Sequence, residues 1–257
     1  MSGEPVSKKV NATVSAGFEP EALERLERDA KEIIARYPKP RSALLPLLHL
    51  VQSEEGYVTK NGVAFCAQQL GITEAEVTGV VTFYTQYKRR PVGEYHVGVC
   101  INTLCAVMGG DQIWSELSEH VGVGHDEATE DGKVSLERIE CNAACDYAPV
   151  MTVNWEFYDN MTPEKAKQLV DDLRVGKEVL PSRGPDSLTT WKGASRVLAG
   201  FPDGKALEGP QAGSRSLVGL ELAKEHGWQA PPAEGHPEPD EPATGPMAPG
   251  NQEDVNL

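Results

Sequence analysis

The sequence predicts an α+β protein, in which an N-terminal helical bundle precedes a small α/β domain and a disordered C-terminal tail. Three observations predict this organisation. Residues 19–90 contain successive apolar patterns with helical spacing. Residues 91–180 alternate short strand patterns with helix patterns in the order β-α-β-β-α. Residues 181–257 contain eleven Pro and eleven Gly, a composition that leaves too few apolar side chains for a core.

The N-terminal bundle is expected to contain about four helices over residues 19–90. Pro20 suits the first turn of the first helix, because the N–H that proline lacks would have no partner there. Ser42 is the expected N-cap of the second helix. Thr73 and Glu76 have the spacing of a capping box at the start of the last helix.

The α/β domain is expected to span residues 91–180. The segment "EYHVGVCI" predicts a first strand, and "AVMGGDQIWSELSEHVG" predicts one helix after it. A second strand, "GKVSLERIEC", is followed by one or two strands within "PVMTVNWEFYDN". A closing helix begins with Thr162 as N-cap and Pro163 in its first turn. This order indicates a small α/β sandwich.

The two ends of the chain are expected to lack a core of their own. Residues 1–18 have few bulky apolar side chains and predict a flexible leader. The tail, residues 181–257, contains two more apolar segments, "SLTTWKGASRVLAGF" and "SLVGLELAKEHGW", each with one Trp. Docking of these segments on a partner and transient helix formation are both compatible with the sequence.

The charge distribution excludes one class of partner. The net charge is −15, and residues 91–180 carry 6 Lys and Arg against 17 Asp and Glu. The segment "VAFCAQQLGITEAEVTGVVTFY" has the pattern of a helix-turn-helix, but its second helix contains Glu74 and Glu76 and no basic residue before Lys88. Because phosphate contacts need Lys and Arg, no nucleic-acid partner is predicted. A basic protein surface is a better match for the acidic segment.

The compartment follows from the absence of apolar runs. No stretch approaches the roughly 18 apolar residues of a membrane span, so no direct membrane insertion is predicted. The N-terminus lacks the apolar region of a secretory signal, and a cytoplasmic location with reduced thiols is therefore expected. The five cysteines are an odd number, which also argues against a disulfide framework.

Four of these cysteines form two spaced pairs. Cys100 and Cys105 make a C-x4-C pair, and Cys141 and Cys145 make a C-x3-C pair after 35 intervening residues. Neither pair has the C-x-x-C spacing of a catalytic dithiol, and no catalytic residue is predicted. Four thiolates suit either a structural zinc ion or a [2Fe-2S] cluster, and the spacing alone leaves zinc open. The fifth cysteine, Cys66, lies in an apolar helix and is expected to be a buried, inert thiol.

The surroundings of the two pairs favour an iron–sulfur cluster. The residues between the paired cysteines, "INTL" and "NAA", are small and uncharged, so backbone N–H groups can turn toward the sulfur atoms. Such hydrogen bonds offset the negative charge of a cluster with four thiolates. The acidity of residues 91–180 should oppose the addition of an electron and lower the reduction potential.

Several motifs in order resemble one family. "LGITEAEVTGVVTFYTQY" is similar to its signature helix, "VCINTLCAVMGG" supplies its C-x4-C, and "ECNAACDYAPVMTVNWEFYDNMTPEKAKQLVDDLRVGK" supplies its C-x3-C and the elements that follow. Over about residues 19–180 the chain thus resembles the E-subunit family of bacterial NADH–quinone oxidoreductase, respiratory complex I, whose members are thioredoxin-like [2Fe-2S] proteins. Each pair of cysteines alone would be unspecific, whereas the pairs embedded in these segments are highly specific.

The resemblance implies a thioredoxin-like domain in which Cys100, Cys105, Cys141 and Cys145 bind one [2Fe-2S] cluster. It implies an electron-transfer subunit that exchanges single electrons with FMN in a flavoprotein partner, which also binds NADH. Other peripheral-arm subunits would be partners too, at the cytoplasmic side of the cell membrane. The chain itself shows no G-x-G-x-x-G fingerprint after a strand.

Two alternatives remain open at this point. The same module is found in the NAD-linked part of soluble hydrogenases and formate dehydrogenases. A protein of another class, a zinc-stabilised scaffold subunit without redox chemistry, would also use four cysteines.

Overall fold

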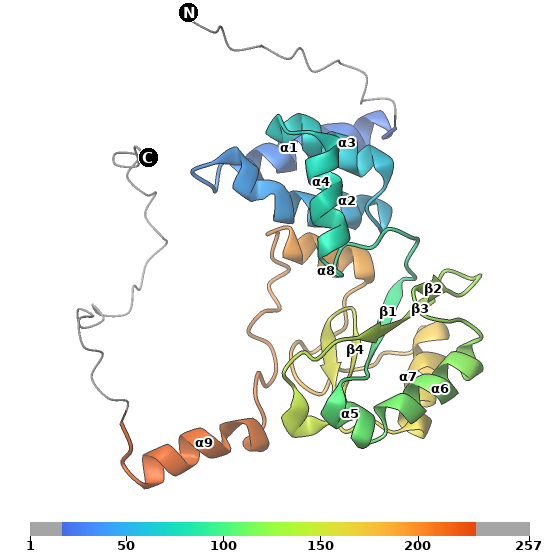
Figure 1. The fold of residues 1–257 in the computed structure, drawn as a ribbon, viewed down its shortest axis with the longest axis vertical. Helices are drawn as coiled ribbons and strands as arrows, with labels where there is room; N and C mark the ends of the chain where they lie inside the picture. The colour runs from blue at the N-terminus through green and yellow to red at the C-terminus, as the bar shows by residue number, and fades with distance from the viewer. Residues whose placement is uncertain (1–16, 230–257) are drawn as a thin grey trace, which may run out of the picture. The chain divides into compact units, whose positions relative to one another are not determined.

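The computed structural model describes residues 17–229 (Figure 1). The described residues up to 211 belong to one compact unit, and those from 212 onward belong to a second. The first unit contains a helical bundle and a five-stranded sheet with its own helices, and each of the two has a separate hydrophobic core. The predicted fold class, a helical bundle followed by an α/β domain, is confirmed.

The bundle contains four α-helices joined by short connections. They are α1 (Pro20–Ile34), α2 (Leu44–Glu55), α3 (Lys60–Leu70) and α4 (Glu74–Phe83). The predicted starts of α1 at Pro20 and of α4 at the Thr73–Glu76 capping box are confirmed, since the Thr73 hydroxyl accepts from the Glu76 N–H and the Glu76 carboxylate accepts from the Thr73 N–H.

Ser42 is not the N-cap that the sequence predicts. The residues from Pro40 to Ala43 form a 3₁₀ turn, in which the Ser42 N–H donates to the carbonyl of Lys39 at 3.0 Å. The helix α2 begins only after this turn, at Leu44, and no side chain caps it. The i→i+3 bonds of the turn take the place of a cap, because they satisfy backbone groups that otherwise need one.

The core of the bundle reaches further toward the N-terminus than predicted. Phe18, which the sequence assigns to the flexible leader, packs edge-on against Phe65 with 6.1 Å between the ring centroids. An aromatic side chain at this position buries apolar surface that a leader would leave in water. The remainder of the predicted leader, residues 1–16, lies outside the described residues.

The sheet has the strand order β2-β3-β1-β4-β5. Its strands are β1 (Tyr95–Cys100), β2 (Glu127–Ala128), β3 (Val134–Ile139), β4 (Met151–Val153) and β5 (Glu156–Tyr158). The two central strands, β1 and β3, are parallel, with Cys100 opposite Ile139, and the remaining pairs are antiparallel. The carboxyl ends of β1 and β3 therefore lie at the same edge of the sheet.

Helices α6 (Gly110–Val121) and α7 (Pro163–Arg174) lie together on one face of the sheet (Figure 1). Val97 and Val99 of β1 belong to the core under these helices, whereas the side chain of His96, the residue before Val97, points to the other face. The sequence predicts one helix after β1, but the structure has two, α5 (Thr103–Val107) and α6. Gly109 separates them with a φ of 114°, which is favourable for glycine and strained for other residues.

Replacing Thr162 with Ala is expected to lower the free energy of unfolding by about 1 kcal/mol. The Thr162 hydroxyl caps α7 by accepting from the Lys165 N–H at 3.3 Å, so its removal leaves that donor without a protein acceptor. Urea denaturation of the two proteins measures the difference. Thr82→Ala is the control, because the Thr82 hydroxyl donates to carbonyls within α4, and a loss as large as that of Thr162→Ala would contradict the capping role.

The tail departs from the expectation of disorder over its first part. Residues 181–211 belong to the first unit, and helix α8 (Trp191–Leu198) packs against α2 of the bundle. The Trp191 side chain is 1% exposed, and its indole N–H donates to the Gly56 carbonyl at 2.6 Å. The first apolar segment of the tail therefore packs on its own chain, because one buried Trp supplies the apolar area that the Pro- and Gly-rich composition lacks.

The second apolar segment forms α9 (Ser214–Glu225) in the second unit. No side chain of α9 is buried within the described residues. The rest of the predicted tail, residues 230–257, lies outside the described part of the chain. Over residues 17–229, no helix combines the length and the apolar character that crossing a membrane requires.

Candidate metal centre

The four paired cysteines lie at the edge of the sheet where β1 and β3 end. Cys100 is the last residue of β1, and Cys105 follows on α5. Cys141 comes two residues after the end of β3, and Cys145 begins a short 3₁₀ turn, Cys145–Tyr147. Because β1 and β3 are parallel neighbours, the two loops that follow them meet at one place, although 35 residues separate the two pairs.

Within each pair the two thiols are neighbours. The Sγ atoms of Cys141 and Cys145 are 3.4 Å apart, and the Cys105 thiol lies near enough to Cys100 to raise the pKa of the Cys100 thiol. A disulfide bond measures about 2.05 Å, so these are free thiols. Two thiolates on one tetrahedral ion, with bonds of about 2.3 Å, are about 3.8 Å apart.

The two pairs are also neighbours of each other. The Cys100 thiol interacts electrostatically with Cys141, and the Cys145 thiol interacts with Cys105. Within residues 17–229, no three His, Cys, Asp or Glu side chains converge as ligands of a single ion. Two pairs of thiolates side by side would suit a two-iron cluster, which takes two thiolates on each iron.

The environment of the thiols differs between the inner and outer cysteines. Cys100 and Cys105 are buried, whereas Cys145 is half-buried and Cys141 is exposed. Burial, followed by the contact with Cys105, raises the pKa of the Cys100 thiol to about 11, against a lowering contribution from the Asn102 backbone N–H. The hydrogen bond with Cys141, followed by burial, raises the pKa of Cys145. A metal ion that binds here must therefore displace protons, so its binding is favoured by high pH.

Backbone N–H groups point at the sulfur atoms, as the small residues between the cysteines predict. The Ala143 N–H donates to the Cys141 sulfur at 3.3 Å, and the Asn102 N–H donates to the Cys100 sulfur. Ala143 has a φ of 57°, a left-handed conformation within the loop between Cys141 and Cys145. Such donors stabilise thiolates, so the site fits a negatively charged iron–sulfur group.

Gly110 has a role at the site that the sequence analysis missed. A Cβ atom at this position would lie 2.6 Å from the Cys100 carbonyl oxygen and 2.9 Å from that of Cys105. Only glycine therefore lets α6 begin so close to the backbone of both cysteines. The Gly-Gly pair inside a helical pattern is the signal that could have identified this close approach.

A family model describes this combination of fold and cysteines. The model of the thioredoxin-like [2Fe-2S] ferredoxins matches residues 30–174, more than half of the chain. The chain belongs to the thioredoxin-like [2Fe-2S] ferredoxin family. The match includes all four paired cysteines, and it ends before the tail.

Curated relatives of this ferredoxin extend the comparison. The E subunit of the NADH-quinone oxidoreductase of Mycobacterium tuberculosis is 60% identical over 219 residues, which are 85% of this chain and 86% of that protein. NADH-quinone oxidoreductase subunit 2 of Thermus thermophilus is 38% identical over 152 residues, 58% of this chain and 84% of that protein. Among solved structures, a NAD⁺-reducing [NiFe]-hydrogenase is similar with a TM-score of 0.47 and 16% identity, over 51% of this chain and 22% of that one.

The fifth cysteine of this ferredoxin is separate from the other four. Cys66 lies on α3 in the core of the bundle and is fully buried. Burial raises the pKa of its thiol, so Cys66 stays protonated and unreactive. The prediction of a buried cysteine is confirmed.

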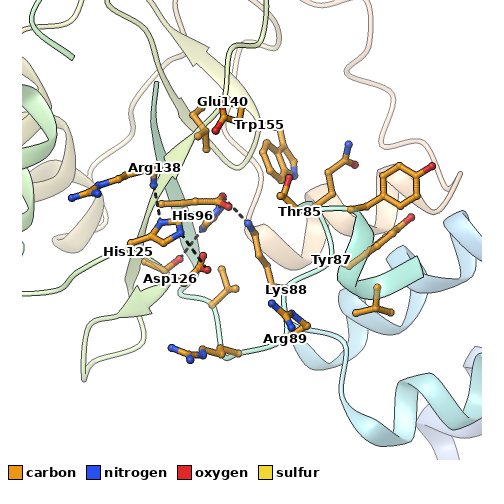
Figure 2. Close-up of a pocket in the computed structure, with 18 of the residues that line it drawn as sticks. Thr85, Tyr87, Lys88, Arg89, His96, His125, Asp126, Arg138, Glu140 and Trp155 are labelled. Carbon is orange, nitrogen blue, oxygen red and sulfur yellow. Dashed lines mark hydrogen bonds and ion pairs between the residues drawn. The ribbon is translucent and has the colours of Figure 1, made fainter. Parts of the chain in front are cut away.

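The ferredoxin also has a cavity of about 860 Å³, whose lining includes Glu140 and Asn142 on either side of Cys141. It lies between residues 84–92, which follow the bundle, and the sheet face opposite α6 and α7. Figure 2 shows Lys88 extending toward His96 across this cavity. The Glu137 carboxylate binds both, at 2.6 Å from Lys88 Nζ and 2.7 Å from His96 Nε2.

This buried network gives His96 a structural role. Burial lowers the pKa of His96, although the Glu137 carboxylate acts in the opposite direction. Burial alone would raise the pKa of Glu137, but His96 and Lys88 together lower it. The network therefore consists of one Lys–Glu ion pair and a histidine that is mainly neutral, and it joins the bundle to the sheet.

Proposed function

We propose that this protein is the iron–sulfur electron-transfer subunit of an NADH-quinone oxidoreductase. Cys100, Cys105, Cys141 and Cys145 would hold one [2Fe-2S] cluster. The observation that carries this proposal is the meeting of the four free thiols as two pairs at the carboxyl ends of β1 and β3, in a chain of the [2Fe-2S] ferredoxin family.

A bound [2Fe-2S] cluster supplies a centre that accepts and releases one electron at a time. The residues of the chain supply its ligands, its electrostatic environment and its position. The buried Cys100 and Cys105 shield one side of the site from water, while the exposed loop at Cys141 leaves the other side accessible to a partner. The N–H donors of Asn102 and Ala143 stabilise the negative charge of the thiolates.

The partner in this proposal is a flavoprotein subunit that carries FMN and the NADH site, with which this chain exchanges single electrons. The names of the relatives support it, since NADH-quinone oxidoreductase joins NADH oxidation to a quinone. The protein would sit among the peripheral-arm subunits at the cytoplasmic side of the membrane. The net charge of −11 in residues 91–180, from 6 basic and 17 acidic residues, favours association with a basic partner surface.

Anaerobic purification of the full chain tests the cluster. About two irons and two sulfides per chain are expected, with a red-brown colour and a [2Fe-2S] EPR signal after reduction. A colourless protein with one zinc ion per chain would instead indicate the zinc-stabilised scaffold.

Co-purification from the native cell tests the assembly. The expected result is a complex with an FMN-containing subunit and with quinone-linked membrane subunits. A complex with hydrogenase or formate dehydrogenase subunits would contradict the assignment to NADH-quinone oxidoreductase while leaving the electron-transfer role intact.

A further inference from the structure

A buried ion pair near the cysteine site joins Asp159 of the matched ferredoxin region to Arg183, which lies beyond that region. Arg183 lies in the first part of the tail, nine residues beyond the end of the match at residue 174. Its backbone pairs with Phe157 of β5 in an isolated antiparallel bridge, and the Ser182 N–H donates to the Phe157 carbonyl at 2.7 Å. The tail is thus fixed against the last strand of the sheet at this point.

The Arg183 side chain lies between an acidic partner and two aromatic rings. Its Nη2 atom is 3.1 Å from Asp159 Oδ1, and the two side chains are only 15% and 8% exposed. The guanidinium carbon is 4.4 Å from the centroid of the Phe157 ring and 5.7 Å from that of Tyr147. These distances are in the range of cation–π contacts.

The two aromatic rings connect the ion pair to the cysteines. Tyr147 and Phe157 both pack against the buried cluster of side chains that includes Cys100 and Cys105. The guanidinium thus contacts two rings that pack against the same buried cluster as the cysteines. In such an interior, a charge acts on its neighbours much more strongly than it does in water.

We infer that Arg183 and Asp159 each act on the reduction potential of the cluster that the four cysteines hold, with effects of opposite sign. The inference rests on the proposed function. Reduction adds one negative charge to the site, which Arg183 favours and Asp159 opposes. Since the two charges lie together, their effects largely cancel, and removal of either one leaves the other without compensation.

This role predicts shifts of opposite sign, which a purely structural ion pair would not produce. Asp159→Asn leaves the Arg183 cation unpaired and raises the potential. Arg183→Gln leaves the Asp159 carboxylate unpaired and lowers it. The double variant removes both charges and returns the potential close to that of the unchanged protein. Each single shift is expected to change the ratio of reduced to oxidised cluster at a fixed potential by about tenfold, or about 59 mV for one electron.

The experiment is a redox titration of the full chain, purified anaerobically and followed by EPR. The titration is done at pH 9, which is far above the ordinary carboxyl pKa range, so that carboxyl groups are ionised. Asp29→Asn is the matched control, because Asp29 of α1 pairs with Arg196 of α8 at 3.0 Å, and the cluster potential of this variant is expected to stay unchanged. Thermal unfolding of each variant, measured in parallel, reports the loss of the ion pair separately from the potential.

Opposite shifts for Asp159→Asn and Arg183→Gln, with recovery in the double variant, support the inference. Shifts in the same direction, no shift in either variant, or an equal shift for Asp29→Asn overturn it. If Arg183→Gln does not fold, Asp159→Asn and the double variant decide, since an unchanged or lowered potential in Asp159→Asn is already incompatible with the inference. If the protein without substitutions shows no [2Fe-2S] signal, the proposed function is overturned as well. If that signal is normal but the single variants have the same potential as the protein without substitutions, only this inference is overturned.

Discussion

Cys141→Ser is expected to lose most of the iron of the protein, from about two irons per chain to nearly none, together with its EPR signal. Cys141 is the exposed member of the pair with Cys145, and their sulfur atoms lie 3.4 Å apart. A serine oxygen at this place is a hard donor with a much higher pKa than a thiol, so it replaces a soft thiolate poorly. Iron and sulfide analysis after anaerobic purification, with EPR of the reduced protein, measures the effect.

Cys66→Ser is the matched control for this experiment. It makes the same chemical change at a cysteine that lies in the core of the bundle, on α3. The iron content and the EPR signal are expected to remain, although a hydroxyl buried without a partner costs about 1–3 kcal/mol of stability. Loss of the signal in Cys66→Ser, or its retention in Cys141→Ser, would contradict the assignment of the ligands.

Trp191→Ala is expected to lower the free energy of unfolding by about 3–5 kcal/mol. The Trp191 indole is buried, with 4.9 Å between its centroid and that of the His96 ring and 5.8 Å to Trp155. Its N–H donates to the carbonyl of Gly56 at the end of α2, and its backbone N–H donates to Glu94 before β1. Removing the indole opens a cavity where the tail, the bundle and the sheet meet.

Urea denaturation measures this loss. Unfolding is monitored by far-UV circular dichroism rather than by tryptophan fluorescence, because the substitution removes a tryptophan. Trp228→Ala is the control, because the Trp228 side chain is 66% exposed and belongs to the second unit. Its effect is expected to stay within about 0.5 kcal/mol. Equal effects of the two substitutions would show that Trp191 does not hold α8 against the bundle.

The helices of the bundle could be predicted closely because their signals are local. Pro20 and the Thr73–Glu76 box identify helix starts through contacts within one turn of the chain. Ser42 shows the limit of such reasoning, since a good N-cap residue lies inside a 3₁₀ turn instead. The intrinsic conformational propensity of serine does not distinguish these two cases, because the same residue types favour both an N-cap and a turn.

The candidate site could be predicted to the level of its four cysteines and their small neighbours. Spacing left zinc and a [2Fe-2S] cluster both open, and the family match includes all four residues. The place of Gly110 against two cysteine carbonyls depends on how α6 approaches the end of β1, and no local pattern encodes that approach. The same holds for Tyr147 and Phe157, which look like ordinary aromatic residues until the sheet places them beside the cysteines.

The sequence by itself predicted the order of bundle and sheet, the helix starts at Pro20, Thr73 and Thr162, and the four cysteines as candidate ligands, because these depend on spacing, capping and side-chain chemistry over a few residues. Only the tertiary structure decided which distant groups meet. Trp191 bonds to Gly56 across 135 residues, and Arg183 pairs with Asp159 across 24. Such contacts form when burial of apolar surface brings preformed elements together, so their partners are set by packing in three dimensions rather than by neighbours in the chain.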